Sequence, residues 1–215
     1  MREYFAEKVL RAFPLLIYIK LVIAFILFKE EGAMFLAGFL LLSDSFNWLL
    51  KHAILKPIMG KTDYPIFGTG TRPKGAMNCG AFINGKKSTS YGMPSGHSQF
   101  ASLLTTYIVL NLLNATNRKF PKHDILRGMF VVGAVIMGVS VCLSRVIFGC
   151  HTQQQVLIGA FIGMIFLYLV PLPLYIILPL AVGFGVGLMI LLNVTHPPAG
   201  GNPIIVIMGS VSPDY

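Results

Sequence analysis

Six apolar stretches alternate with polar segments along the 215-residue chain. They lie roughly at residues 13–28, 33–55, 99–113, 128–148, 156–170 and 172–194. An α-helix needs about 20 apolar residues to cross a hydrocarbon core about 30 Å thick, and each stretch approaches that length. The pattern predicts an all-α membrane protein, a bundle of about six transmembrane helices that forms a single domain over residues 1–215.

The polar segments between these stretches fall on two faces of the predicted bundle. The longest, residues 57–97, is rich in Gly, Lys, Ser and Thr, and loops of that length in compact proteins are usually functional or disordered. With six spans, this loop lies on the same face as the link around residues 145–151, whereas residues 114–127 lie opposite. We therefore expect residues 57–97 to be the active-site loop.

Residues 1–12 are expected at the membrane surface, and the C-terminal end at that surface or packed on the bundle. Residues 1–12 are typical of an interfacial helix, because apolar and charged side chains recur there on opposite sides at helical spacing. The C-terminal tail, residues 195–215, contains an apolar piece too short to span. Its His196-Pro197-Pro198 run has a weak similarity to a motif of certain small-anion membrane proteins, and a Pro/Gly turn after the last helix explains it equally well.

The composition supports a membrane bundle and adds a positive charge to be explained. Hydrophobic residues make up 55% of the chain and charged residues only 12%, whereas soluble domains carry about a quarter charged residues. The formal net charge is +9. No basic helix or aromatic–basic groove accompanies it, so nucleic acid is not an expected partner. The cations are expected to flank the bilayer and to hold an anionic substrate.

Cysteine usage predicts neither a disulfide nor a zinc site. Cys79, Cys142 and Cys150 are odd in number and have no paired spacing. A zinc site or a disulfide framework normally shows regular spacing. We therefore expect three free thiols.

The first candidate for chemistry is the run Pro94-Ser95-Gly96-His97, where the polar loop changes into the third apolar stretch. Such a change predicts a helix start, and the unpaired N–H groups at a helix start suit a bound phosphate. Ser95 adds a hydroxyl donor, and His97 adds a group that titrates near neutral pH. The competing interpretation is a capping serine beside an incidental histidine.

The second candidate is the link that contains Arg145, His151 and Gln155. An arginine at a membrane boundary is often only a snorkelling anchor, and a histidine at a helix end is often structural. Both residues are nevertheless predicted to lie on the same face as Ser95 and His97. That shared location favours a common site.

The third candidate is a polar stripe on the second apolar stretch. Asp44, Asn47 and Lys51 share one side of a helix, and polar groups at membrane depth normally face a bundle interior or a cavity. Alternatively, Lys51 snorkels and Asp44 is a structural polar group. Arg72 follows in the loop, directly before Pro73.

These residue types together suit phosphoryl transfer. A phosphate group carries about two negative charges, and guanidinium groups bind it with two-pronged geometry. One neutral histidine can attack phosphorus, and a second, protonated histidine can donate to the leaving oxygen. The scheme requires neither a metal nor a cofactor.

The motifs resemble those of the type 2 phosphatidic acid phosphatase superfamily, in particular its dolichyl-diphosphatase-like branch. The resemblance rests on Pro94-Ser95-Gly96-His97 and on Ser144-Arg145 with His151. It implies a six-helix membrane hydrolase that acts on a lipid phosphate or polyprenyl diphosphate. It further implies that His151 is the nucleophile and His97 the general acid, and that the phosphate is bound by Lys51, Arg72, Ser95, Gly96 and Arg145.

The chain departs from the family pattern at two places. The family's first Lys and Arg are separated by six residues, whereas Lys51 and Arg72 are separated by twenty. Either an insertion loops out between them, or Lys61 or Lys74 replaces Lys51. The family's Asp after the nucleophile is Gln155 here, which orients the ring through an amide and without a carboxylate charge.

Several functional alternatives follow from the same residues. They are a phosphatidate phosphatase, a lipid phosphotransferase, and a catalytically impaired lipid-binding or transport protein. The excess of Lys and Arg on the active-site face favours a cytoplasmic site, whereas the family resemblance implies a lumenal one, in the endoplasmic reticulum. Asn114-Ala115-Thr116 is a glycosylation sequon on the opposite face, and it offers a way to decide.

Overall fold

The computed structural model describes residues 2–80, 87–88, 90–114 and 124–169. The chain divides into two compact units, Met1–Leu167 and Tyr168–Tyr215, and the first contains every predicted site residue. The predicted sixth span and the tail lie outside the described residues. The count of six spans therefore stays a prediction.

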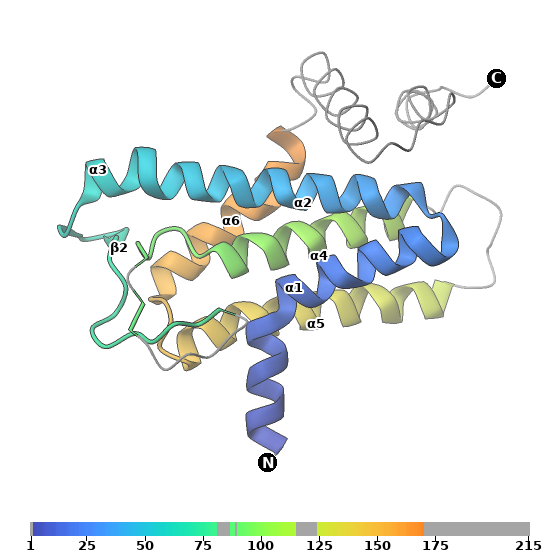
Figure 1. Cartoon of the computed structure of the whole chain (residues 1–215), viewed down its shortest axis with the longest axis horizontal. Coiled ribbons are helices and arrows are strands. Elements are labelled where there is room, and N and C mark those ends of the chain that lie inside the picture. Colours follow the sequence, from blue (N-terminus) through green and yellow to red (C-terminus); the bar gives the residue numbers. More distant parts are fainter. Residues whose placement is uncertain (1, 81–86, 89, 115–123, 170–215) are drawn as a thin grey trace. The chain divides into compact units, whose positions relative to one another are not determined.

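Helices make up most of the first unit (Figure 1). In chain order they are α1 (Arg2–Phe28), α2 (Glu31–Leu49), the π-helical turn η1 (Leu50–Leu55), α3 (Lys56–Met59), α4 (Gly96–Asn114), α5 (Asp124–Ile147) and α6 (Gln153–Leu169). Two short antiparallel strands, β1 (Asp63–Tyr64) and β2 (Gly68–Thr69), lie in the loop after α3. The first five predicted stretches each correspond to a helix, which confirms the helical class.

Three helical segments are long and apolar enough to cross a membrane, namely Glu7–Phe28, Glu31–Met59 and Ile125–Ile147. The apolar helix Gln153–Leu167 is shorter. Large apolar side chains on these helices are exposed: Phe28 is 71% exposed and Met129 65%. In water such surfaces would be unfavourable, and they are suited to contact lipid.

Helix α4 lies among the other helices of the first unit (Figure 1). Its Phe100 packs edge-on against the rings of Phe13 and Tyr18 from α1. Its Gln99 hydrogen-bonds Asn47 of α2. On α6, a Cβ atom added at Gly159 would lie 2.5 Å from the Ser95 carbonyl oxygen. Glycine at that position therefore permits the close approach of α6 to the start of α4.

The loop between α3 and α4 is joined to the α5–α6 link by a disulfide between Cys79 and Cys150. The expectation of three free thiols is therefore wrong, and only Cys142 is free. The two half-cystines are 71 positions apart, so no local spacing in the sequence indicates that they pair. The bundle brings their Cα atoms to 6.0 Å, well within disulfide reach.

Helix α1 is continuous from Arg2 to Phe28 and contains Pro14. It changes direction along its course (Figure 1), as helices do where a proline removes a backbone hydrogen bond. Residues 2–12 are helical as expected, and their location in the membrane interface stays a prediction. Arg11, one of the charged side chains of this segment, is only 7% exposed.

Candidate active site

The run from Ser95 to His97 forms the start of α4, as the change from polar to apolar residues predicted. Helix α4 begins at Gly96, and Ser95 is fully buried. The Ser95 N–H donates to the Gln155 carbonyl at 3.0 Å, and its hydroxyl accepts from the Ser98 hydroxyl at 2.9 Å. The start of α4 is therefore fixed directly against the start of α6.

His151 is held by the side chain of Gln155. The Gln155 Nε2 atom donates to the carbonyls of Thr69 and Thr71, at 2.8 and 2.6 Å. Because carbonyls only accept, these two bonds fix which end of the amide is nitrogen. The Oε1 atom then accepts from His151 Nδ1 at 3.0 Å. The ring proton is thus on Nδ1, and Nε2 keeps its lone pair, as a nucleophile requires.

Arg145 is fully buried at the end of α5. Its guanidinium donates to three neutral oxygens: the Ser144 hydroxyl and the carbonyls of Cys79 and Leu10, at 3.2, 3.1 and 3.0 Å. In the described part of the chain it forms no ion pair. Its positive charge is therefore positioned but not neutralised, which favours binding of an anion.

The polar stripe on the second apolar stretch faces the bundle interior, as predicted. Asn47 donates to Gln99 at 2.8 Å, and Asp44 accepts from Tyr18 at 2.8 Å. Lys51 lies in η1, the kind of π-helical turn that often occurs at functional sites. A Cβ atom added at Gly96 would lie 4.0 Å from Lys51 Nζ, so this amine is close to the start of α4.

Arg72 completes the group of cations. Its Nη1 donates to the Cys150 carbonyl at 3.0 Å, directly before His151, and its Nε and Nη2 donate to Ser90. The β1–β2 hairpin (residues 63–69) lies between Lys51 and Arg72 in the chain, where an insertion was expected to loop out. Lys61 and Lys74 are exposed, whereas Lys51 lies close to the start of α4.

The two histidines have unusually low pKa values. Burial, with the positive charges of Arg72 and Lys51, lowers the pKa of His151 to about 3. Burial and the charge of Arg145 lower the pKa of His97 to about 4. Both rings are thus neutral in the empty site at pH 7. This state suits the predicted nucleophile, whereas the predicted general acid must gain a proton when an anion binds.

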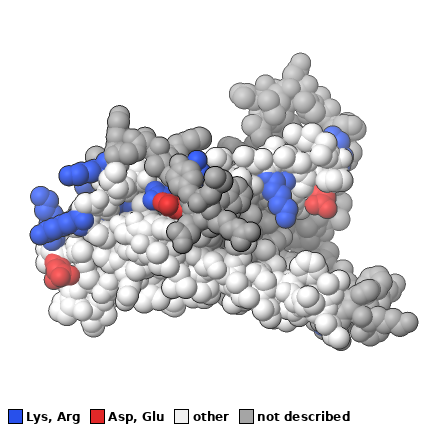
Figure 2. All heavy atoms as spheres, turned by 90° about the horizontal axis from the view of Figure 1, so that it is seen from below, with Lys and Arg blue, Asp and Glu red and all other residues white. Residues whose placement is uncertain are grey.

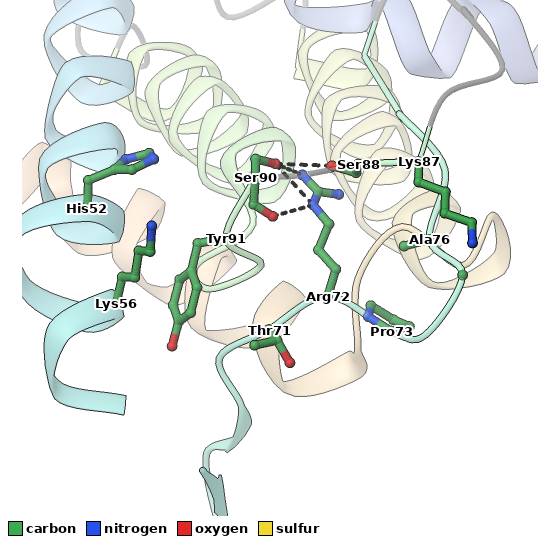
Figure 3. A pocket seen from close by; sticks show the side chains of 11 residues that line it. His52, Lys56, Thr71, Arg72, Pro73, Ala76, Lys87, Ser88, Ser90 and Tyr91 are labelled. Carbon is green, nitrogen blue, oxygen red and sulfur yellow. Dashed lines mark hydrogen bonds between the residues drawn. The ribbon is translucent and has the colours of Figure 1, made fainter. Parts of the chain in front are cut away.

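A cavity of about 310 Å³ adjoins Arg72. Figure 3 shows His52 and Lys56 on its helical side and Lys87 across from them, with Arg72 directed toward Ser90. Lys and Arg side chains also gather on the surface at the end of the molecule where α3 and the strands lie (Figure 2). The cavity therefore adds further positive charge next to the site.

Sequence reasoning missed several contributors to this arrangement. Arg11 donates to the Asn78 carbonyl at 2.9 Å and lies over the Phe148 ring at 5.4 Å. An arginine three positions before a proline in an apolar helix was the available signal. The carbonyls of Thr69 and Thr71, which hold Gln155, left no signal in the sequence. Among the described residues, no group of three His, Cys, Asp or Glu side chains is placed to hold a metal ion.

The fold and site are those of a helical membrane protein whose polar end is suited to a phosphate group. Residues 32–178 match the sequence profile of the PAP2 superfamily, which covers more than half of the chain. The chain therefore belongs to the PAP2 superfamily and is a multi-pass membrane protein. Residues 155–214 also match a profile described as HPP, transmembrane region.

Several similar curated proteins are named as dolichyldiphosphatases. Dolichyldiphosphatase 1 of Rhinolophus ferrumequinum is 30% identical over 155 residues, which are 70% of this chain and 56% of that protein. Dolichyldiphosphatase 1 of Homo sapiens is 32% identical over 66% of this chain and 52% of its own. Dolichyldiphosphatase of Saccharomyces cerevisiae is 30% identical over 65% and 50%. The chain thus spans about half the length of these relatives. No solved structure matches it.

Proposed function

We propose that the protein is a membrane phosphatase that hydrolyses a polyprenyl, dolichyl-like diphosphate through a phosphohistidine. One observation carries the proposal. His151 is oriented by an anchored amide, is neutral at pH 7, and lies within the electrostatic influence of Lys51 and Arg72. A nucleophile that attacks an anion needs this combination of an available lone pair and neutralising charge.

In the proposed reaction, His151 Nε2 attacks the terminal phosphorus and forms an N–P bond. The bond from phosphorus to the bridging oxygen breaks, and His97 gives its proton to that oxygen, so that the lipid monophosphate leaves. Water then attacks the phosphorus of the phosphohistidine, His97 accepts a proton from it, the N–P bond breaks, and inorganic phosphate is released with His151 restored. Lys51, Arg72, Arg145, the Ser95 hydroxyl and the N–H group of Gly96 hold the phosphoryl oxygens throughout.

Two observations support a diphosphate over a monoester as substrate. The named relatives are dolichyldiphosphatases. In addition, the cavity next to Arg72 contains the further cations Lys56 and Lys87, which a second phosphate group can use. A phosphatidate phosphatase, a lipid phosphotransferase and an inactive lipid-binding protein remain the alternatives.

The disulfide supports a site that faces the lumen of the endoplasmic reticulum. Cys79 lies in the active-site loop and Cys150 directly before His151. Disulfides persist in oxidising compartments and are rare in the cytosol. A lumenal site also agrees with the family resemblance and outweighs the excess of Lys and Arg, because several of these cations surround the site itself. Glycosylation at Asn114, on the opposite face, would contradict this orientation.

The function is tested with the purified protein in detergent and excess chelator. We expect release of inorganic phosphate from a polyprenyl diphosphate, faster than from phosphatidate, and none after His151→Ala. Mass spectrometry of the acid-quenched reaction is expected to find phosphate on His151. His196→Gln, outside the segment that matches the PAP2 profile, serves as the histidine control. Full activity of His151→Ala would refute the mechanism, and transfer of phosphate to an added alcohol in place of water would identify a transferase.

A further inference from the structure

Helix α1 lies entirely before the segment that matches the PAP2 profile, residues 32–178, yet two of its backbone carbonyls hold residues of the site. The Leu10 carbonyl accepts from Arg145 Nη2 at 3.0 Å. The Arg11 carbonyl accepts from His97 Nε2 at 2.9 Å. In an uninterrupted α-helix such oxygens accept from the N–H group four residues later. Their use by side chains of other helices therefore needs a cause.

Pro14 provides the cause. Proline has no backbone N–H, and its ring displaces the carbonyl of the residue four positions before it. That residue is Leu10. The Arg11 carbonyl is next along the same bent part of α1 (Figure 1). A single proline therefore accounts for the free Leu10 oxygen and for the bend that brings its neighbour to His97.

The Leu10 carbonyl matters because Arg145 is fully buried. A buried guanidinium needs acceptors for its N–H groups. Leu10 and Cys79 provide the two carbonyls that hold its two terminal nitrogens; Leu10 lies before the segment that matches the PAP2 profile and Cys79 lies within it. Without the Leu10 oxygen, the Nη2 side of the guanidinium has no fixed direction in which to meet a phosphate.

The side chain of Arg11 fixes α1 in this position. Its Nε and Nη2 pair with Glu7, the latter at 2.7 Å, and its Nη1 donates to the Asn78 carbonyl at 2.9 Å. Its guanidinium lies over the Phe148 ring, 5.4 Å from the centroid, and Arg145 lies over the same ring at 5.9 Å. The bent segment is thus bound to the active-site loop and to the end of α5.

We propose that Pro14 is a positioning residue of this site: it releases the Leu10 carbonyl to Arg145 and bends α1 so that the Arg11 carbonyl holds His97. Only the catalytic part of this proposal rests on the proposed function. Anion binding tests it without turnover.

The contact with Arg11 gives the proposal a pH signature. The charged and titratable groups near His97 are Arg145 of α5, Lys51 of η1, Arg72 of the loop and His151 before α6, and the three cations oppose protonation of the ring. The Arg11 carbonyl acts in the opposite direction, because it accepts a hydrogen bond and thereby favours the imidazolium. Its loss lowers the pKa of His97 further.

The first variant is Pro14→Ala, which returns an N–H to the helix for the Leu10 carbonyl. Alanine favours a helix, so this variant is expected to fold. The concentration of orthovanadate that gives half of the maximal rise in melting temperature is expected to increase about tenfold, which corresponds to a loss of about 1.4 kcal/mol of binding free energy. The kcat for a polyprenyl diphosphate is expected to fall about tenfold. In the pH profile of kcat, the alkaline limb, where His97 loses its proton, is expected to move to lower pH. Leu16→Ala, at an exposed position of the same helix, is the control and is expected to stay within twofold of the wild type.

A second variant exchanges two neighbours, Pro14→Leu with Leu15→Pro, so that composition and bend are kept. Leu15 is 39% exposed, so the exchange removes little from the core. The proline at position 15 now frees the Arg11 carbonyl, while the Leu10 carbonyl regains its helical donor. We expect the loss of orthovanadate affinity to persist and the alkaline limb to return to its wild-type position.

The outcomes separate this inference from the proposed function. Unchanged orthovanadate affinity in both variants overturns the positioning role of Pro14, whether or not the enzyme turns over. A fall in kcat with no shift of the alkaline limb in Pro14→Ala overturns the part that concerns His97. If the wild type binds orthovanadate but releases no phosphate from any lipid substrate, the proposed function fails while the binding test still decides on Pro14.

Discussion

The amide of Gln155 leads to a prediction that distinguishes this site from one with a carboxylate at the same position. Glutamate has the same length as glutamine, but its ionised carboxylate only accepts hydrogen bonds. In Gln155→Glu, the carbonyls of Thr69 and Thr71 both lose the donor that they share now, at 2.8 and 2.6 Å. The new charge also faces these two carbonyl oxygens. His151 keeps an acceptor for Nδ1 only if the carboxylate stays in place against this repulsion.

The magnitude follows from the two lost bonds. A partly buried carbonyl without a donor costs about 1–2 kcal/mol, so the pair costs about 2–4 kcal/mol of stability. For a chain of this size that corresponds to a fall in melting temperature of about 5–10 °C. Loss of the fixed ring orientation lowers kcat by about 10²-fold or more, as when an orienting partner is altered in a catalytic triad.

The assay compares wild type, Gln155→Glu and Gln155→Ala for phosphate release and thermal stability in the same detergent. We expect Gln155→Glu to be slower than the wild type, although a carboxylate would stabilise a charged imidazole. We also expect its stability to improve as the pH falls through the pKa of the new carboxyl, because protonation restores one donor. A Gln155→Glu variant that is faster than wild type and equally stable would refute the reasoning.

Three further predictions follow from particular contacts. Binding of orthovanadate is expected to take up a proton between pH 5 and 7. Burial and the neighbouring cations hold the pKa of His97 at about 4, and the bound anion offsets the effect of the cations. Calorimetry in buffers of different ionisation enthalpy measures the uptake, and persistence of the same uptake in His97→Ala would contradict it. Replacing both half-cystines by serine is expected to lower the free energy of unfolding by about 4 kcal/mol, as estimated for a closed loop of 71 residues, and to lower activity. Cys142→Ser is expected to leave both stability and activity unchanged. Equal melting temperatures of the double variant and the wild type would argue against a structural role for the disulfide. Gly159→Ala is expected to displace the Ser95 carbonyl, 2.5 Å from the added methyl group, and therefore to lower the melting temperature and to reduce kcat at least tenfold. Gly133→Ala, with nothing within 4 Å of the added methyl group, serves as the control. A fully active Gly159→Ala would show that α6 can move without loss of activity.

The lengths and positions of the helices followed from the sequence because the membrane itself imposes them. A hydrocarbon core sets the number of apolar residues in a span, so five apolar stretches already indicated five helices. The start of α4 was predicted for a similar reason, since Pro94 and Gly96 interrupt regular structure directly before an apolar run. The polar stripe of Asp44, Asn47 and Lys51 was also predicted to face inward, because polar groups at membrane depth are costly elsewhere.

The sequence could not decide between Lys51, Lys61 and Lys74 for the first cation. Spacing along the chain carries that information only when no insertion intervenes, and here the β1–β2 hairpin intervenes. The structure favours Lys51 through the contact of η1 with the start of α4, where Lys51 Nζ comes to 4.0 Å from a Cβ position on Gly96. A contact between segments 45 positions apart has no local signature.

By itself, then, the sequence determined the membrane class, the helices before residue 170 and the motif residues that meet at one end of the bundle. Only the tertiary structure decided what holds them: the Cys79–Cys150 disulfide, the two threonine carbonyls that orient Gln155, and the α1 carbonyls that hold Arg145 and His97. The physical reason is that hydrophobic periodicity and turn residues act over one or two helical turns. Backbone carbonyls have no residue identity, and they bind partners as far as 135 positions away.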